Sequence, residues 1–235
     1  MNKQTTLVGV GGLLAGLLIG FMFANSINQK GVAAVSAEAK SNSNMPVGHP
    51  DISGSSSAPG STGAMPAQTQ AVIDKAKQSP QDFDAQIAAA ELYYQIERYP
   101  EAISFLQAAN KLKPDDREVI VHLGNANFDA GNYEEAEKWY ASALSKKDDV
   151  NVRTDLGLTF VFRDTPDYDK AITEFNKSLA IDPNHIQALQ NLTVAYTKKG
   201  DASKASSTLT KLESVDPKNS AISRLKDDIQ KMGTK

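Results

Sequence analysis

The sequence predicts an all-α chain in which stacked helical hairpins follow an apolar segment and a polar linker. The main observation is a repeat, because Ala102, Ala136, Ala171 and Ala205 lie 34 or 35 residues apart in similar local sequences. Such a period indicates one small helical unit copied several times, in which each copy buries its apolar face only against its neighbours. The other two observations are an apolar run near the start of the sequence and, after it, a segment without aromatic residues or leucine.

The apolar run covers residues 7–24 and contains neither a charged residue nor proline. A helix of this length reaches about 27 Å, close to the thickness of the hydrocarbon core of a bilayer. We therefore expect residues 1–6 to form a short tail and residues 7–24 a single transmembrane helix that is retained as an anchor. The alternative is a cleaved signal peptide, which has a shorter apolar core and a cleavage site close behind it. Lys3 favours a cytoplasmic N-terminus, with the rest of the chain outside the cytoplasm.

Three glycines of this run, Gly12, Gly16 and Gly20, share one helix face at a spacing of four residues. Small residues at this spacing let two membrane helices approach closely, so the face could form a homodimer. The alternative interpretation is that glycine is simply common in membrane helices.

Residues 25–66 are rich in Ser, Gly, Pro, Ala and Asn. Such a segment cannot bury enough apolar surface to offset the entropy cost of ordering, so we expect a flexible linker. His49 lies between glycine and proline in this segment and could be a ligand for a metal or haem, or part of a docking motif. An ordinary linker residue is the simpler interpretation, because one imidazole without partner ligands makes a weak site.

The remainder is predicted to be helical, beginning with a lead-in helix within residues 67–80. We expect this helix to end at Gln78, with Ser79 as the N-cap of the next helix and Pro80 at its first position. Four helix pairs follow, expected at 81–97 and 100–112, 116–130 and 133–146, 150–163 and 167–181, and 185–199 and 202–214. The corresponding units are 81–114, 115–148, 149–183 and 184–217. A last helix within residues 218–235 would cap the array, because it carries one apolar stripe and a polar opposite face.

Equivalent positions recur in the four pairs. A pair that ends in a small residue stands in the middle of each first helix, at Ala89-Ala90, Leu123-Gly124, Leu156-Gly157 and Leu192-Thr193. A large residue follows each repeat alanine by four positions, at Leu106, Tyr140, Phe175 and Leu209. Prolines follow three of the second helices, at Pro114, Pro183 and Pro217.

This pattern resembles the tetratricopeptide repeat family over about residues 82–217. The resemblance implies a right-handed superhelical solenoid of about four repeats, in which the first helix of each pair lines a concave groove. The third unit departs from the pattern, with two extra residues around Asp164–Asp167 where we expect a local bulge. The arrangement of anchor, linker and repeats resembles that of membrane-anchored bacterial members of the family.

In the register that the resemblance implies, the groove holds a partner with side chains from all four units. These are Glu91, Tyr94, His122, Asn125, Phe128, Asp155, Phe162, Gln187, Asn191 and Lys198. Asparagine side chains can bond the backbone of an extended or helical peptide, and the scarcity of cations argues against a clamp for a terminal carboxylate. The alternative for each aromatic residue is packing between neighbouring helices. We interpret residues 129–138 as a turn followed by a solvated helix face, not as an acidic binding site.

The charge, the cysteine content and the motifs of the sequence argue against several classes of function. The net charge is −3, which does not favour nucleic-acid binding, and the sequence contains no cysteine for disulfides or thiol catalysis. The sequence shows no nucleophile elbow, phosphate loop or metal-ligand motif, so we expect no enzyme, cofactor or metal. The prediction is a non-enzymatic interaction scaffold in the cytoplasmic membrane, with a periplasmic groove that binds a peptide or protein during assembly of an envelope complex. The alternative is a chaperone-like factor for exported proteins, in cytochrome c maturation or near the translocon.

Overall fold

The computed structural model describes residues 67–232, which belong to one compact unit, Met65–Lys235. Four predicted features lie outside the described residues: the anchor at 7–24, its glycine face (Gly12, Gly16 and Gly20), the linker at 25–66 and His49. Among the helices at residues 67–232, none is both long enough and apolar enough to cross a bilayer.

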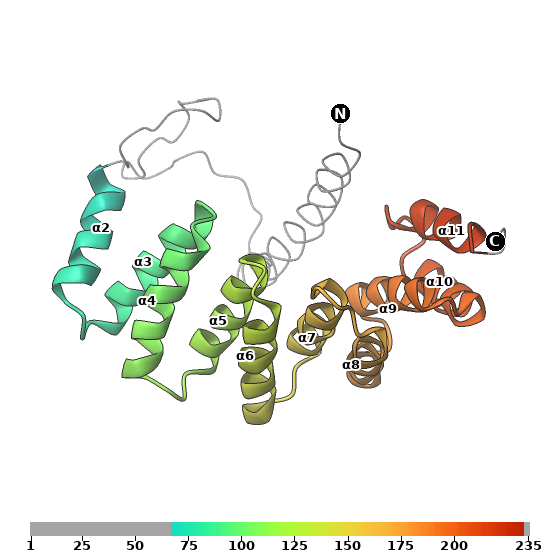
Figure 1. Cartoon of the computed structure of the whole chain (residues 1–235), viewed down its shortest axis with the longest axis horizontal. Helices are drawn as coiled ribbons and strands as arrows, with labels where there is room; N and C mark the ends of the chain where they lie inside the picture. The colour runs from blue at the N-terminus through green and yellow to red at the C-terminus, as the bar shows by residue number, and fades with distance from the viewer. Residues whose placement is uncertain (1–66, 233–235) are drawn as a thin grey trace, which may run out of the picture. The chain divides into compact units, whose positions relative to one another are not determined.

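The described residues contain ten helices and no strand, which confirms the predicted all-α class (Figure 1). The helices follow one another in chain order as a row of hairpins. Their bounds are α2 (Ala67–Gln78), α3 (Phe83–Gln95), α4 (Tyr99–Leu112), α5 (Arg117–Asp129), α6 (Tyr133–Lys146), α7 (Val150–Phe162), α8 (Tyr168–Ile181), α9 (Ile186–Lys199), α10 (Ala202–Val215) and α11 (Ile222–Gln230).

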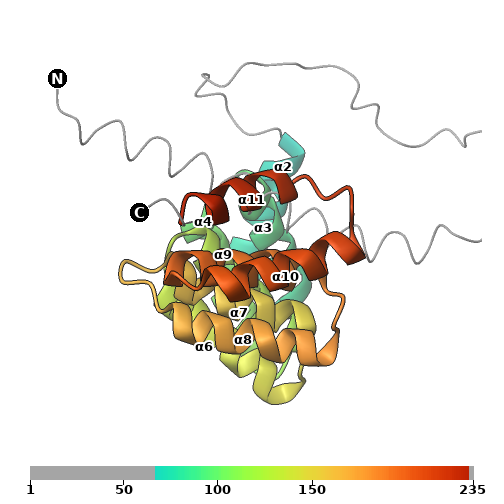
Figure 2. The ribbon, with the colours of Figure 1, turned by 90° about the vertical axis from the view of Figure 1, so that its right-hand side faces the viewer.

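Each hairpin packs most extensively within itself and next against the first helix of the hairpin that follows. The pairs are α3 with α4, α5 with α6, α7 with α8 and α9 with α10, and α4, α6 and α8 each also contact the next first helix. We call α3, α5, α7 and α9 the inner helices and α4, α6, α8 and α10 the outer helices. At one end α2 packs on α3, and at the other α11 lies against α9 and α10 (Figure 2). Such nearest-neighbour contacts define a solenoid.

The inner helices begin at residues whose side chains accept hydrogen bonds from the first turn. Asp116 Oδ1 accepts from the backbone N–H of Glu118 at 3.0 Å and of Val119 at 3.2 Å, and Asp149 caps α7 in the same way. Asp82 caps α3 by accepting from Ala85 N at 3.0 Å. The prediction that Ser79 caps this helix is therefore wrong. The carboxylate of Asp82 satisfies the orphan N–H and adds a favourable interaction with the helix dipole, which a hydroxyl lacks.

The turns inside the hairpins place one residue in the left-handed region of backbone space. Gly131 and Gly200 occupy this position in the second and fourth hairpins, with φ of 79° and 88°. Glu97 occupies it in the first hairpin with φ of 59°, at a conformational cost of about 1–2 kcal/mol for a residue with a Cβ atom. The third hairpin avoids the conformation through its longer turn, which closes when Asp167 N donates to Phe160 O at 2.8 Å.

The centre of each hairpin requires a very small side chain. Ala102, Ala136, Ala171 and Ala205 are all completely buried on the outer helices. On the inner helices, a Cβ atom at Gly124 would lie 2.5 Å from Cε1 of Tyr140, and one at Gly157 would lie 2.4 Å from Cε1 of Phe175. Both distances are far below van der Waals contact, so the rings occupy the space that the glycines leave.

In the first and fourth hairpins, the side chains at these two equivalent positions have different sizes. Ala90 and Leu106 belong to one buried cluster, at the positions equivalent to glycine and the aromatic ring. Thr193 and Leu209 are the equivalents in the fourth hairpin. A smaller outer-helix side chain thus accompanies a larger inner-helix one, as constant packing density requires.

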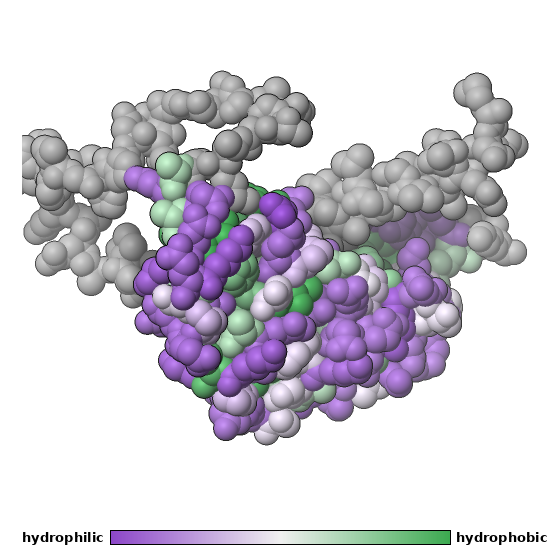
Figure 3. All heavy atoms as spheres, turned by 60° about the vertical axis from the view of Figure 1, so that its left-hand side comes forward, coloured by the Kyte–Doolittle hydropathy of each residue, from purple (hydrophilic) through white to green (hydrophobic). Residues whose placement is uncertain are grey.

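The surface is mostly hydrophilic on the face in Figure 3, where apolar residues appear only in narrow strips. Trp139 is half-buried and packs against the cluster that contains Leu106 and Leu123. The helices of the hairpins have only 13 or 14 residues, so they are stabilised by burial of their apolar side chains and not by helix propensity alone.

We expect Gly157→Ala to destabilise the protein by about 1–3 kcal/mol, because the new methyl group overlaps the ring of the fully buried Phe175. Phe175→Leu alone should also destabilise, by leaving a cavity. The double variant should cost at least about 1 kcal/mol less than the two single changes together, because leucine leaves room for the methyl group as in the first hairpin. Urea unfolding followed by circular dichroism measures all three, and strictly additive losses would contradict this packing account.

Candidate functional site

All ten predicted groove residues lie on the inner helices, but at different depths. Glu91 and Lys198 are exposed, whereas Phe128 and Asn191 are buried. The others are half-buried: Tyr94, His122, Asn125, Asp155, Phe162 and Gln187. Phe128 and Asn191 therefore support the inner face from beneath instead of forming its surface.

An aromatic cluster joins the ends of α5, α6 and α7. The ring of Phe128 meets the edge of Tyr133 at a centroid distance of 5.3 Å and that of Phe162 at 5.8 Å. Tyr133 and Phe162 stack at 6.2 Å with 25° between their planes. Edge-to-face and offset arrangements of this kind contribute beyond burial alone, so the cluster fixes the second hairpin against the third.

A second aromatic group lies on the first hairpin and reaches the second. Tyr94 and Tyr99 make an edge contact at 5.4 Å, and the Tyr94 hydroxyl donates a hydrogen bond to a carboxylate oxygen of Asp129. Burial and the charge of Asp129 both raise the pKa of Tyr94, so its hydroxyl stays protonated and remains a donor. The bond joins α3 to the last residue of α5.

Two carboxyl groups on this face have raised pKa values. Burial raises the pKa of Asp129 to about 6, against the hydrogen bond from Tyr94, which lowers it. Burial also raises the pKa of Asp155 to about 7, with further contributions from the negative charges of Asp129 and Asp149. At neutral pH the inner face therefore carries carboxyl groups whose ionisation is unfavourable.

Asn125 is oriented from the core of its hairpin. The hydroxyl of Tyr140, which is buried over Gly124, donates to Asn125 Oδ1 at 2.9 Å. This bond fixes the orientation of the amide group, whose nitrogen can act only as a donor. Asn191, in contrast, has a buried Nδ2 atom without a hydrogen-bond partner.

Sequence reasoning missed Tyr99 and Tyr133 as parts of this face, and it missed the partial burial of Asp129. The interpretation of residues 129–138 as a turn and a solvated helix face is wrong for Asp129, which is half-buried against Tyr94. The position of Asp129 at the end of an inner helix, one residue after Phe128, is the feature of the sequence that could have indicated its burial. Across residues 67–232, no three His, Cys, Asp or Glu side chains come together to hold a metal ion.

Comparison with known proteins identifies the repeat. A family model described as tetratricopeptide repeat matches residues 65–119, 97–154 and 166–229. These ranges together cover more than half of the chain and leave out residues 155–165, which include the start of the longer turn in the third hairpin.

Solved structures with the same fold include MamA and YrrB. MamA is 24% identical, with 64% of this chain and 87% of the other covered, at a TM-score of 0.58. YrrB, described as a TPR protein with an unusual peptide-binding site, is 20% identical, with 68% and 81% covered, at a TM-score of 0.60. A tetratricopeptide repeat protein from Parabacteroides merdae is 20% identical, with 66% and 61% covered, at 0.60. At these identities the likeness shows the fold alone.

One curated relative is the intraflagellar transport protein 88 homolog of Homo sapiens, which is 29% identical over 134 residues. The match covers 54% of this chain but only 16% of the relative's length, so it is a likeness between repeat segments.

We expect the raised pKa of Asp155 to make stability depend on pH. This carboxyl ionises near pH 4 in the unfolded chain and near pH 7 when folded, so the protein loses stability as pH rises through that window. Asp155→Asn should therefore stabilise the protein by about 1–3 kcal/mol at pH 8, after allowance for solvent screening, and by nothing below about pH 4.

Urea unfolding at several pH values tests this, with Asp227→Asn on the exposed face of α11 as a control that should show no such trend. A stabilisation by Asp155→Asn that is the same at every pH would contradict the assignment.

Proposed function

The chain belongs to the tetratricopeptide repeat family, and we propose that it is a non-enzymatic scaffold that binds a peptide or protein along the face formed by its inner helices. The observation that carries the proposal is the set of half-buried aromatic and amide side chains on α3, α5 and α7. Tyr94, Asn125 and Phe162 are held in place by contacts to other helices, so they are pre-organised for a ligand. Pre-organisation lowers the entropy cost of binding.

The chemistry of this face suits an extended or helical peptide. The rings of Tyr94 and Phe162 offer apolar contact area, which aromatic anchors supply efficiently at interfaces. The Asn125 amide can donate to a peptide carbonyl, since its oxygen already accepts from Tyr140. Side chains of this kind give a peptide both register and affinity.

We expect selection of a random peptide library on the full chain to yield ligands that need this face. Phe162→Ala and Asn125→Ala should each weaken the best selected peptide by at least about tenfold, because each removes a pre-organised contact. Lys211→Ala, on the exposed surface of an outer helix, is the matched control and should bind normally. Fluorescence anisotropy with the labelled peptide measures the change. Equal affinity in all three variants would place the ligand elsewhere.

We also propose that residues 7–24 anchor the chain in the cytoplasmic membrane, with residues 25–66 as a linker and the repeats outside the cytoplasm. The support is the uncharged apolar sequence of residues 7–24 and Lys3 before it. In this arrangement the scaffold would recruit a partner during assembly of an envelope complex.

We expect the full chain to stay with bacterial membranes through an alkaline carbonate wash, and a variant without residues 7–24 to be released. Protease added to intact spheroplasts should digest the repeats, because they face outward. Recovery of the full chain in the soluble fraction would overturn the anchor, and protection from protease would overturn the orientation.

A further inference from the structure

On the second and third inner helices, the arginines are paired with acidic residues, whereas two of the carboxyl groups have no lysine or arginine partner among residues 67–232. Arg117 on α5 pairs with Asp149 at 3.4 Å, and Arg153 on α7 pairs with Asp148 at 2.5 Å and Glu174 at 2.8 Å. The arginines of these helices are therefore neutralised by acids of the inter-unit turn and of α8. Asp129 and Asp155, on the same two helices, form no ion pair with a lysine or arginine anywhere in residues 67–232.

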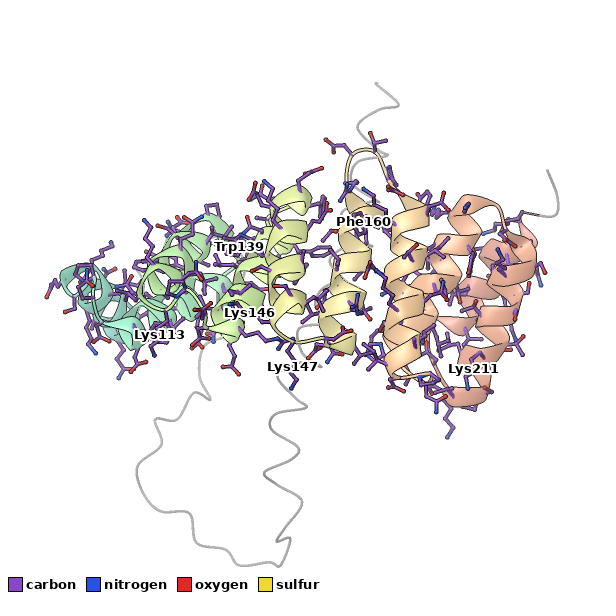
Figure 4. The ribbon with its side chains drawn as sticks, turned by 90° about the horizontal axis from the view of Figure 1, so that it is seen from below. Lys113, Trp139, Lys146, Lys147, Phe160 and Lys211 are labelled. Atoms are coloured by element: carbon purple, nitrogen blue, oxygen red, sulfur yellow. The ribbon has the colours of Figure 1, made fainter. Side chains whose placement is uncertain are left out.

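Four lysines lie at another edge of the solenoid, while Arg98 and Arg163, at the same edge as Asp129, are paired with Glu101 and Glu137. In Figure 4, Lys113, Lys146 and Lys147 lie along the edge where α4 and α6 end, with Lys211 farther along. Asp129 is the last residue of the inner helix α5, and in an antiparallel hairpin the two helices end at opposite edges. These lysines therefore cannot neutralise Asp129.

The surroundings of Asp129 are aromatic, and Asp155 lies close enough to this group to act electrostatically on Tyr94 and Tyr140. Tyr94 bonds Asp129 and touches Tyr99, and the cluster of Tyr133 and Phe162 begins one residue away at Phe128. Ring faces attract a lysine or arginine cation, and more strongly when water is excluded. A carboxylate among such rings suits a cation better than an anion or a neutral group.

On the basis of the proposed function, we propose that the inner face selects a peptide segment carrying a lysine or arginine, whose cation pairs with Asp129 and Asp155 among Tyr94, Tyr99 and Phe162. Charge complementarity carries the inference, since two carboxyl groups on a partner-binding face form no ion pair with the lysines and arginines of residues 67–232. Arrival of the cation favours their ionised forms, which burial disfavours in the unbound protein.

The pairing links binding to proton release. Because ionised carboxylates bind the cation, affinity should rise as pH increases from 5 to 8, through the pKa values of about 6 and about 7. Other charged or titratable groups also lie near this region. They are Glu97, Tyr94 and Tyr99 from the first hairpin, His122, Tyr133 and Tyr140 from the second, and Asp149 and Asp164 from the third.

The test uses a displayed random peptide library selected on the full chain at pH 8. Peptides from the parent should carry lysine or arginine at one fixed position, and those selected on Asp129→Asn/Asp155→Asn should lack this preference. For the best parental peptide, Asp155→Asn should weaken binding at least tenfold at pH 8 and flatten its pH dependence. Asp227→Asn removes one negative charge from α11 and should leave both properties unchanged.

One further protein variant and one altered peptide test whether the carboxyl groups and the peptide cation cause the effect. His122→Gln should keep the pH dependence, and its loss would assign the dependence to the imidazole and overturn the proposal. A version of the peptide with glutamine at the cationic position should bind the parent about as weakly as the original peptide binds Asp155→Asn. Because asparagine removes an unfavourable buried charge, circular dichroism should show that Asp155→Asn is folded.

The outcomes distinguish the two proposals. Peptides that need Phe162 and Asn125 but show no cationic preference would overturn this inference and leave the peptide-binding function intact. A library that yields no specific ligand would overturn both. A cationic preference that survives Asp129→Asn/Asp155→Asn would place the cation site elsewhere and overturn the inference alone.

Discussion

The hairpins depend on how closely two helix backbones can approach at one point. At that point an outer-helix alanine is completely buried, and the inner helix carries glycine, alanine or threonine according to the size of the side chain opposite. In the second and third hairpins the aromatic rings of Tyr140 and Phe175 take the volume that Gly124 and Gly157 leave free. A change of one methyl group is therefore felt, because cores are packed at crystal-like density.

The same contact also prepares the inner face. Only a glycine at 124 lets the ring of Tyr140 pass so close to α5 that its hydroxyl reaches Asn125. A leucine at the same place, as in the first and fourth hairpins, would fill the core but donate no hydrogen bond. The choice of glycine with tyrosine thus connects hairpin packing to the orientation of a side chain on the inner face.

The fold was predictable from local sequence, whereas the site was predictable only in part. The repeat alanines, the small inner-helix positions and the prolines after the second helices act over a few residues, so they predict the helices closely. The N-cap at Ser79 was wrong because Asp82, three residues later, is a stronger acceptor for the first turn. The partial burial of Asp129 was missed because its surroundings depend on Tyr94, 35 residues earlier and on another hairpin. The burial of Phe128 depends in the same way on a neighbouring unit, because its ring contacts Phe162.

The cost of the two carboxyl groups argues for a role beyond folding. Burial makes ionisation of each carboxyl group less favourable, and asparagine or leucine at the same position would avoid that loss. A solenoid tolerates the loss because its stability is a sum over interfaces, so one poor interface does not unfold the array. Local rules that a sequence breaks without benefit to the fold are most often broken at binding sites. The role of Asp129 and Asp155 is therefore to bind a ligand. The ligand must be positively charged, because only a cation offsets the unfavourable free energy of ionising these carboxyl groups.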